Sequence, residues 1–148
     1  MKLRPATTDD AALLFEWAND PETRAGSHTT DPIPWETHVA WLDRVIADPD
    51  RQLYIGVEDG RPVGQVRLDR DGGKHVISTT VAPDARGRGL SEPMMAAAIE
   101  TAEGLVVAEI KPDNVRSVRM CAAVGFVEVD RTDSRVLMVS PGRRDARP

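Results

Sequence analysis

The chain has 148 residues, of which 41% are hydrophobic and 29% are charged. A single domain of this length buries roughly 70% of the surface of its unfolded chain. The formal net charge of -5 has the wrong sign for a domain that binds phosphate backbones, so we expect no nucleic-acid partner. One cysteine, Cys121, excludes an internal disulfide framework and a cysteine-rich zinc module, and we predict no metal site.

No segment is predicted to cross a membrane. The longest uninterrupted apolar run, Met94 to Ile99, is far shorter than the roughly 20 residues that span a bilayer. Residues 1–5 lead into Thr and Asp rather than into the apolar core of a signal peptide. We therefore expect a cytoplasmic protein with no membrane partner.

The N-terminal half predicts two helices and then a meander of three strands. After an extended opening at Leu3 to Pro5, a polar cap at residues 8–10 begins a helix that Asn19-Asp20-Pro21 closes. Apolar residues at helical spacing predict a second helix from Trp35 to Asp48-Pro49. Segments rich in β-branched residues, separated by glycine-containing turns, predict antiparallel strands at Leu53–Val57, Pro62–Leu68 and Lys74–Val81.

The C-terminal half changes to a strand, helix, strand order. A helix from about Ser91 to Glu103 and a strand at Leu105–Ile110 follow the strand that ends at Val81. This order predicts a right-handed crossover, with the two strands parallel or splayed in one mixed sheet. A helix over Asn114–Ala123, closed by Gly125, and a hairpin of Phe126–Val129 with Val136–Val139 complete a single domain over residues 1–140. The Arg-rich tail, 141–148, lacks apolar anchors and is expected to be mobile.

A loop suited to phosphate lies between the strand that ends at Val81 and the helix that begins at Ser91. Arg86-Gly87-Arg88-Gly89-Leu90-Ser91 places two glycines and two arginines there. Backbone N–H groups at a helix N-terminus are unsatisfied, the helix dipole adds positive potential, and glycine lets phosphate oxygens come close. A plain glycine loop with solvated arginines is the alternative.

This loop resembles the acetyl-CoA pyrophosphate loop of the GNAT superfamily of N-acetyltransferases. Asn114-Val115-Arg116-Ser117, followed by Gly125-Phe126, is similar to the second motif of that family. The resemblance extends along nearly the whole chain and implies an α/β (α+β) fold. Its sheet would have about seven mostly antiparallel strands, splayed between those ending at Val81 and Ile110, with about four helices.

The resemblance also implies acetyl-CoA as the co-substrate. Backbone groups around Val81 would pair with the pantetheine arm, and residues 86–91 would hold the pyrophosphate. Asn114 and Ser117 of the second motif would contact the cofactor. Ser91 stands where the family usually has Gly or Ala, and its hydroxyl could bond a phosphate oxygen.

Two residues are candidates for proton transfer. Glu109 is a lone carboxylate in the apolar strand, and desolvation in a cleft would raise its pKa toward that of a useful base. Some family members have a base glutamate here, although a solvent-facing residue or the partner of an Arg is an equal alternative. Cys121 stands where many family members have an acid tyrosine, and a small buried hydrophobe is the alternative. His75 is a weaker candidate base.

The N-terminal half suggests an acceptor. The patterns Trp17 to Arg24, His38 to Trp41 and Pro62 to Arg67 resemble the branch of the family that acetylates nucleotide-linked amino sugars, such as those of the pseudaminic acid pathway. His38 and Trp41 share a helix face that suits a flat ring, and Arg24 or Arg67 could pair with a diphosphate. Core tryptophans and surface ion pairs are the alternatives.

We therefore predict an acetyl-CoA-dependent N-acetyltransferase with a small-molecule amine acceptor, most of all a nucleotide-linked amino sugar. Another small amine or a protein N-terminus remains open within the same class. A non-catalytic acyl-CoA sensor is the alternative from another class, because the usual tyrosine is missing. A homodimer is also left open.

Overall fold

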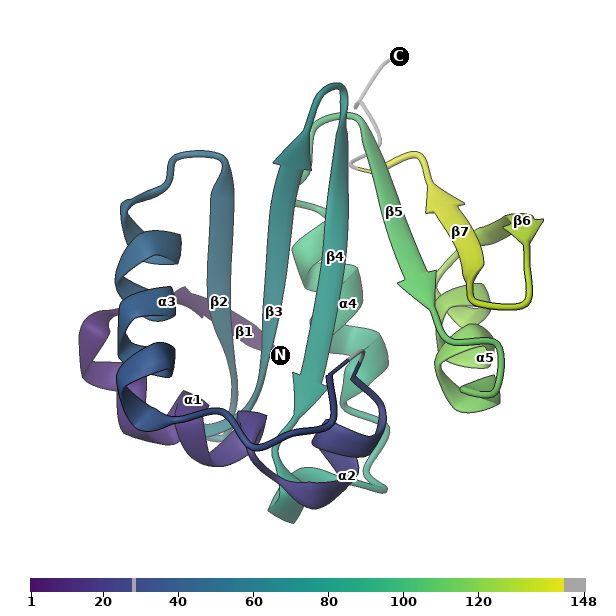
Figure 1. Cartoon of the computed structure of the whole chain (residues 1–148). Coiled ribbons are helices and arrows are strands. Elements are labelled where there is room, and N and C mark those ends of the chain that lie inside the picture. Colours follow the sequence, from purple (N-terminus) through teal and green to yellow (C-terminus); the bar gives the residue numbers. More distant parts are fainter. Residues whose placement is uncertain (28, 143–148) are drawn as a thin grey trace.

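The structure is a computed structural model that describes residues 1–27 and 29–142. Most of the predicted mobile tail, from residue 143 onward, therefore lies outside the described residues. One mixed sheet of seven strands runs through this part of the chain in the order β1-β2-β3-β4-β5-β7-β6 (Figure 1). The strands are β1 (Lys2–Pro5), β2 (Arg51–Glu58), β3 (Arg61–Asp71), β4 (Lys74–Val81), β5 (Leu105–Ile110), β6 (Val127–Arg131) and β7 (Val136–Ser140).

Every neighbouring pair in the sheet is antiparallel except β4 with β5, which run parallel. The mostly antiparallel sheet of about seven strands is thus confirmed. The described part of the chain contains five α-helices, of which α2 is a single short turn. They are α1 (Ala11–Ala18), α2 (Pro21–Ala25), α3 (Trp35–Ala47), α4 (Ser91–Ile99) and α5 (Val115–Ala123).

Two helix predictions need correction. The helix that begins at Ser91 ends at Ile99 rather than at Glu103, because the chain turns there: the Thr101 hydroxyl donates to the carbonyl of Ala98 at 2.7 Å, and Ala102 is fully buried. The short helix α2 was not predicted, since five residues are too few to show a helical period. None of the described helices is long and apolar enough to cross a membrane.

The helices cover the two faces of the sheet separately. In Figure 1, α3 lies beside β2, and α4 lies behind β3 and β4. Side chains alternate between the two faces of a strand, so one strand can contribute residues to a hydrophobic core on each face of the sheet. Leu53 and Ile55 of β2 pack with Leu14, Trp17 and Leu42 on the α1 and α3 side. The opposite core is built around α4 and α5 by Leu68, Met94, Val106, Phe126 and Val136.

The sheet opens between its two parallel strands. β4 and β5 pair only from Lys74 with Leu105 to Val76 with Val107, although β4 continues to Val81. On its other edge, β4 stays paired with β3 as far as Val81. The edge of β4 that faces β5 is therefore unpaired over residues 77–81. This confirms the predicted splay and leaves backbone donors and acceptors in the gap.

Candidate functional site

A cleft of about 1100 Å³ lies at the splayed end of the sheet. Its walls come from the end of β4, the loop before α4, the end of β5, the start of α5 and the segment around α2. The lining includes Glu22, Thr23, Ser27, Thr79, Thr80, Val81, Arg86, Gly87, Gly89, Leu90, Ser91, Lys111, Asn114, Arg116, Ser117 and Arg119. Elements from both halves of the chain thus meet at one cavity.

The loop before α4 is built for an anion. Gly87 and Gly89 have φ values of +78° and +69°, a left-handed conformation that side chains disfavour, and both face open space. Among the described residues, the backbone hydrogen bonds outside helices and strands include none donated by the N–H groups of residues 87–91. These groups precede α4, whose dipole adds positive potential. The loop therefore fits the diphosphate of a cofactor.

The second motif lies across the cleft from this loop. The Asn114 side chain caps α5 by accepting a hydrogen bond from the backbone N–H of Ser117 at 3.2 Å. Both residues line the cleft, as do Val81, Arg86, Gly87, Gly89, Leu90 and Ser91. Arg88 points elsewhere: it is exposed and borders a smaller hollow beside Arg61 and Asp84. The contacts of these residues with a cofactor stay a prediction.

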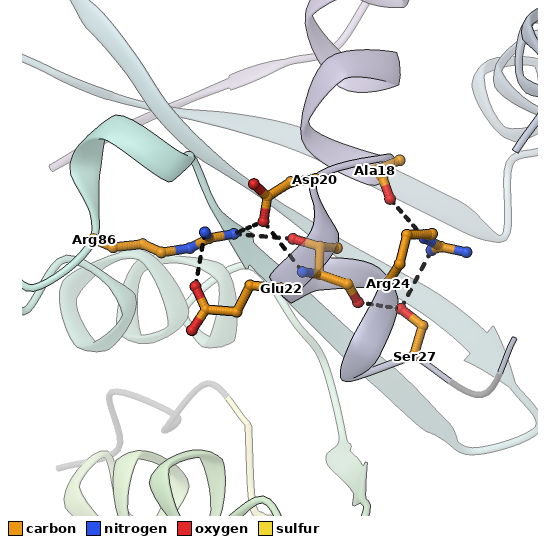
Figure 2. Close-up of polar contacts among 7 residues, drawn as sticks. Ala18, Asp20, Glu22, Arg24, Ser27 and Arg86 are labelled. Atoms are coloured by element: carbon orange, nitrogen blue, oxygen red, sulfur yellow. Dashed lines mark hydrogen bonds and ion pairs between the residues drawn. The ribbon is translucent and has the colours of Figure 1, made fainter. Parts of the chain in front are cut away.

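Arg86 is held by carboxylates. Its guanidinium donates to Asp20 at 2.6 Å and to the Thr23 hydroxyl at 3.1 Å, and it lies 2.8 Å from a Glu22 oxygen (Figure 2). The Arg86 side chain is 24% exposed. The hydrogen bond from Arg86 lowers the pKa of Asp20 below its ordinary value. The first arginine of the loop thus contacts the α2 segment.

Glu109 lies on the exposed face of β5. Its carboxylate accepts a hydrogen bond of 3.2 Å from Arg135, and its side chain is 44% exposed. It belongs to the opposite face from Ala108 and Ile110, which are buried against α4 and α5. The carboxylate is therefore neither desolvated nor part of the cleft lining. Of the alternatives, this placement matches the partner of a nearby Arg.

Cys121 lies inside the core. Its side chain is 2% exposed among the residues that pack around α4 and α5, and burial raises the pKa of the thiol to about 11. It is not part of the cleft lining, whereas its neighbour Met120 is. His75 lies near the far end of β4, where its Nε2 is 3.1 Å from the Glu103 carbonyl oxygen. Neither residue reaches the splayed end.

The predicted acceptor residues fall into two groups. Arg24 donates hydrogen bonds to the carbonyl groups of Ala18 and Thr29 at 2.6 and 3.0 Å, so its guanidinium stabilises the segment around α2. His38 is 3% exposed and lies 3.0 Å from the Ala11 carbonyl oxygen, and burial lowers the pKa of its ring. Both therefore have structural partners in the protein.

Trp41 and Arg67 form the other group. The Arg67 guanidinium lies 5.5 Å from the centre of the Trp41 ring, a cation–π geometry, and donates to Asp69 at 3.0 Å. Arg67 pairs across the sheet with Ser78, whose side chain shares its face. This pair lies on the face of β3 and β4 that also carries α3. A role in binding an acceptor stays a prediction for all four residues.

Sequence reasoning missed several cleft residues. Lys111 follows β5 directly, and its Nζ donates to the backbone carbonyl of Ser27 at 2.6 Å. Its position at the end of the splayed strand was a usable signal. Asp20 and Glu22 lie within the Trp17 to Arg24 pattern, but their contact with Arg86 gave no signal, because that arginine is more than 60 residues away in the sequence.

The family model of the acetyltransferase (GNAT) domain matches residues 1–127. No curated protein matches the chain. Several solved structures are similar to the chain. One is an aminoglycoside acetyltransferase in complex with coenzyme A and kanamycin, with 22% sequence identity, a TM-score of 0.81 and coverage of 95% of this chain and 94% of that one. A spermidine N-acetyltransferase from Vibrio cholerae with CoA and spermine (14%, 0.83, 95% of each) is another. A ribosomal-protein-alanine N-acetyltransferase from Brucella melitensis is a third (22%, 0.81, 95% and 99%).

The chain belongs to the GNAT acetyltransferase family, because the family model covers most of its length. It is an N-acetyltransferase that uses acetyl-CoA as co-substrate. The structural neighbours confirm the fold, at identities too low to carry a substrate across.

Proposed function

We propose that residues 1–140 act as one acetyltransferase domain that transfers an acetyl group to the primary amine of a nucleotide-linked amino sugar. The observation that supports this acceptor is the stacked pair of Trp41 and Arg67 on the face of the sheet. An aromatic ring beside a planar cation suits a nucleobase or sugar ring with an attached phosphate. The motif that contains His38 places Trp41 there, and the motif that begins at Pro62 supplies Arg67.

The cofactor would lie in the splay. The free N–H groups of residues 87–91 would hold the pyrophosphate, and the unpaired edge of β4 at Val81 would bond the pantetheine arm. Asn114 and Ser117 would contact the same molecule from the start of α5. Acetyl-CoA supplies an activated acetyl group as a thioester. Backbone N–H groups near Val81 would stabilise the oxyanion that forms on that group.

Glu109 is our candidate for the base, directly or through a water molecule. An amine must lose a proton to react, and the carboxylate lies on the strand that borders the splay. The Glu109 carboxylate would accept that proton while its Oε1 atom stays paired with Arg135. Cys121 is the weaker candidate for the acid, since its thiol is buried in the core. Water is then the simplest donor to the departing thiolate.

Two observations bear on proton transfer in this enzyme. The thiol at the usual acid position is buried, and the Glu109 carboxylate is paired with Arg135. A water molecule between Glu109 and the amine, and a second one that protonates the departing thiolate, would fit both observations.

A panel of acceptors tests the proposed acceptor class. Release of free CoA thiol is measured from acetyl-CoA with a nucleotide-linked amino sugar, kanamycin, spermidine or a peptide with N-terminal alanine. The proposed function predicts the highest kcat/KM for the nucleotide sugar. A higher kcat/KM for another amine would replace the acceptor class, and tight acetyl-CoA binding without turnover of any of these amines would contradict the proposed function.

A further inference from the structure

The segment around α2 bridges the mouth of the splay. Glu22, Thr23 and Ser27 line the cleft together with residues of the loop that fits a diphosphate. Asn19 fixes the start of this segment: its amide donates to the Ile33 carbonyl at 2.9 Å and accepts from the Ile33 N–H at 2.7 Å. Residues 19–27, which we name the α2 strap, thus form one wall of the site.

The α2 strap is anchored on both of the diverging strands. Arg86, in the loop after β4, contacts Asp20, Glu22 and Thr23 (Figure 2). Lys111, just after β5, donates to the Ser27 carbonyl at 2.6 Å. The anchors approach from the two sides of the splay, so the position of the strap depends on how far these strand ends lie apart.

The charges around Arg86 disfavour a direct bond to phosphate. Two carboxylates, Asp20 and Glu22, surround one guanidinium, which leaves the cluster with a net negative charge. A phosphate would have to displace them against like-charge repulsion. Asp20 also accepts the backbone N–H of Thr23 at 3.2 Å and so caps α2, which makes it costly to move.

We propose that Arg86 is a positioning residue that acts through Asp20 to hold the α2 strap as the acceptor wall, and that the pyrophosphate is left to the backbone of residues 87–91. This inference rests on the proposed function for the use of that wall. Because one loop carries both the phosphate donors and the anchor, a bound cofactor that orders the loop also orders the strap. An acceptor that binds after the cofactor then loses less conformational entropy in ordering the strap.

The test compares Arg86→Gln, Asp20→Asn and the double variant, with CoA as the probe. Calorimetry gives the CoA dissociation constant, and hydrogen exchange gives the protection of the backbone amides of residues 22–27 with CoA bound. Glu128→Gln is the matched control, since it removes an exposed ion pair to Arg131 on β6, outside the cleft lining. Arg86→Lys keeps a cation that can reach Asp20 and serves as the conservative variant.

The expected result is a CoA dissociation constant within about threefold of wild type in all variants, together with a loss of about tenfold or more in strap protection. The double variant loses no more than either single one, and Arg86→Lys restores part of the protection. If Arg86→Gln weakens CoA binding by about tenfold or more while Asp20→Asn does not, Arg86 is a phosphate ligand and the inference is overturned. Neither measurement needs turnover, so failure of the proposed function gives a different result: CoA binding and strap protection without acetyl transfer.

Discussion

The Glu109 carboxylate accepts a hydrogen bond of 3.2 Å from Nη1 of Arg135, a residue that lies 26 positions later at the turn before β7. Arg135 also lies 4.0 Å from Asp130 on β6. The candidate base is therefore held on the open face of the sheet by a cation from the terminal hairpin. The position of the Glu109 carboxylate therefore depends on the conformation of the hairpin of β6 and β7.

Replacing Glu109 tests its role as the base. Because a general base contributes about 10²–10⁴ in rate, Glu109→Gln is expected to lower kcat/KM by about 100-fold or more. The loss should be largest below mildly alkaline pH, where a primary amine is protonated. Gln keeps an oxygen for Arg135, so the thermal midpoint should not change. Initial rates against pH, with the acceptor of highest kcat/KM, provide the measurement, and an unchanged profile removes Glu109 from this role.

The cofactor loop is tested by a pair of glycine variants. Gly89→Ala forces a side chain into a left-handed conformation with φ of +69°, at a cost of about 1–2 kcal/mol in unfolding free energy. Gly72→Ala, in the turn between β3 and β4, meets the same strain at φ of +64° and also faces open space. We expect equal destabilisation from both variants but weaker CoA binding from Gly89→Ala alone. Equal CoA affinities in calorimetry would contradict the assignment of the loop.

The buried cysteine gives a prediction for rate and stability. Cys121→Ala should leave kcat unchanged and lower the unfolding free energy by about 1 kcal/mol through lost packing. The pKa of the thiol is raised from 9.0 to about 11 in the folded protein, so above pH 9 the unfolded chain loses this proton first. Its contribution to stability is thus present below pH 9 and is lost as the pH rises toward 11. Urea titrations at pH 8 and 10.5 should show a larger drop for wild type than for Cys121→Ala. A fall in kcat would instead restore the thiol as the acid.

His38 predicts a loss of stability in mild acid. Burial lowers the pKa of its ring below the ordinary value of 6.5, so the unfolded chain binds a proton at a pH where the folded chain does not. Stability is therefore present above pH 6.5 and falls as the pH drops below that value. His38→Gln removes the titrating group, and its unfolding free energy should fall less than that of wild type between pH 7 and 5. Parallel curves for the two proteins would assign the acid sensitivity to other groups.

The sequence predicted most of the elements because their signals are local. Apolar and β-branched runs identified the strands after β1, which was predicted only as an extended opening, and the apolar spacing from Trp35 onward identified α3. The parallel partner of β4 followed from the strand, helix, strand order and from a family resemblance. The end of α4 was placed too late because the chain turns after Ile99, where Ala102 is buried in the core while Thr101 stays exposed.

The site was predicted less completely because its contacts join distant residues. The loop glycines signal a phosphate site by themselves, yet nothing near Arg86 in the sequence shows that Asp20 is its partner. The same holds for Glu109, whose exposure depends on the open face of the sheet and on Arg135. Arg24 was predicted to bind the acceptor because it belongs to a sequence motif. Its hydrogen bonds to the carbonyl groups of Ala18 and Thr29 show that a motif residue can instead stabilise the local fold.

Direct detection of the product tests the central claim, which is acetyl transfer from CoA to an amine in the splay between β4 and β5. The protein is incubated with acetyl-CoA and the nucleotide-linked amino sugar, and mass spectrometry follows the acceptor while a thiol reagent follows CoA. We expect one added acetyl group for each CoA released, with both reduced in Gly89→Ala and unchanged in Gly72→Ala. CoA binding without an acetylated product from any amine of the panel would contradict it.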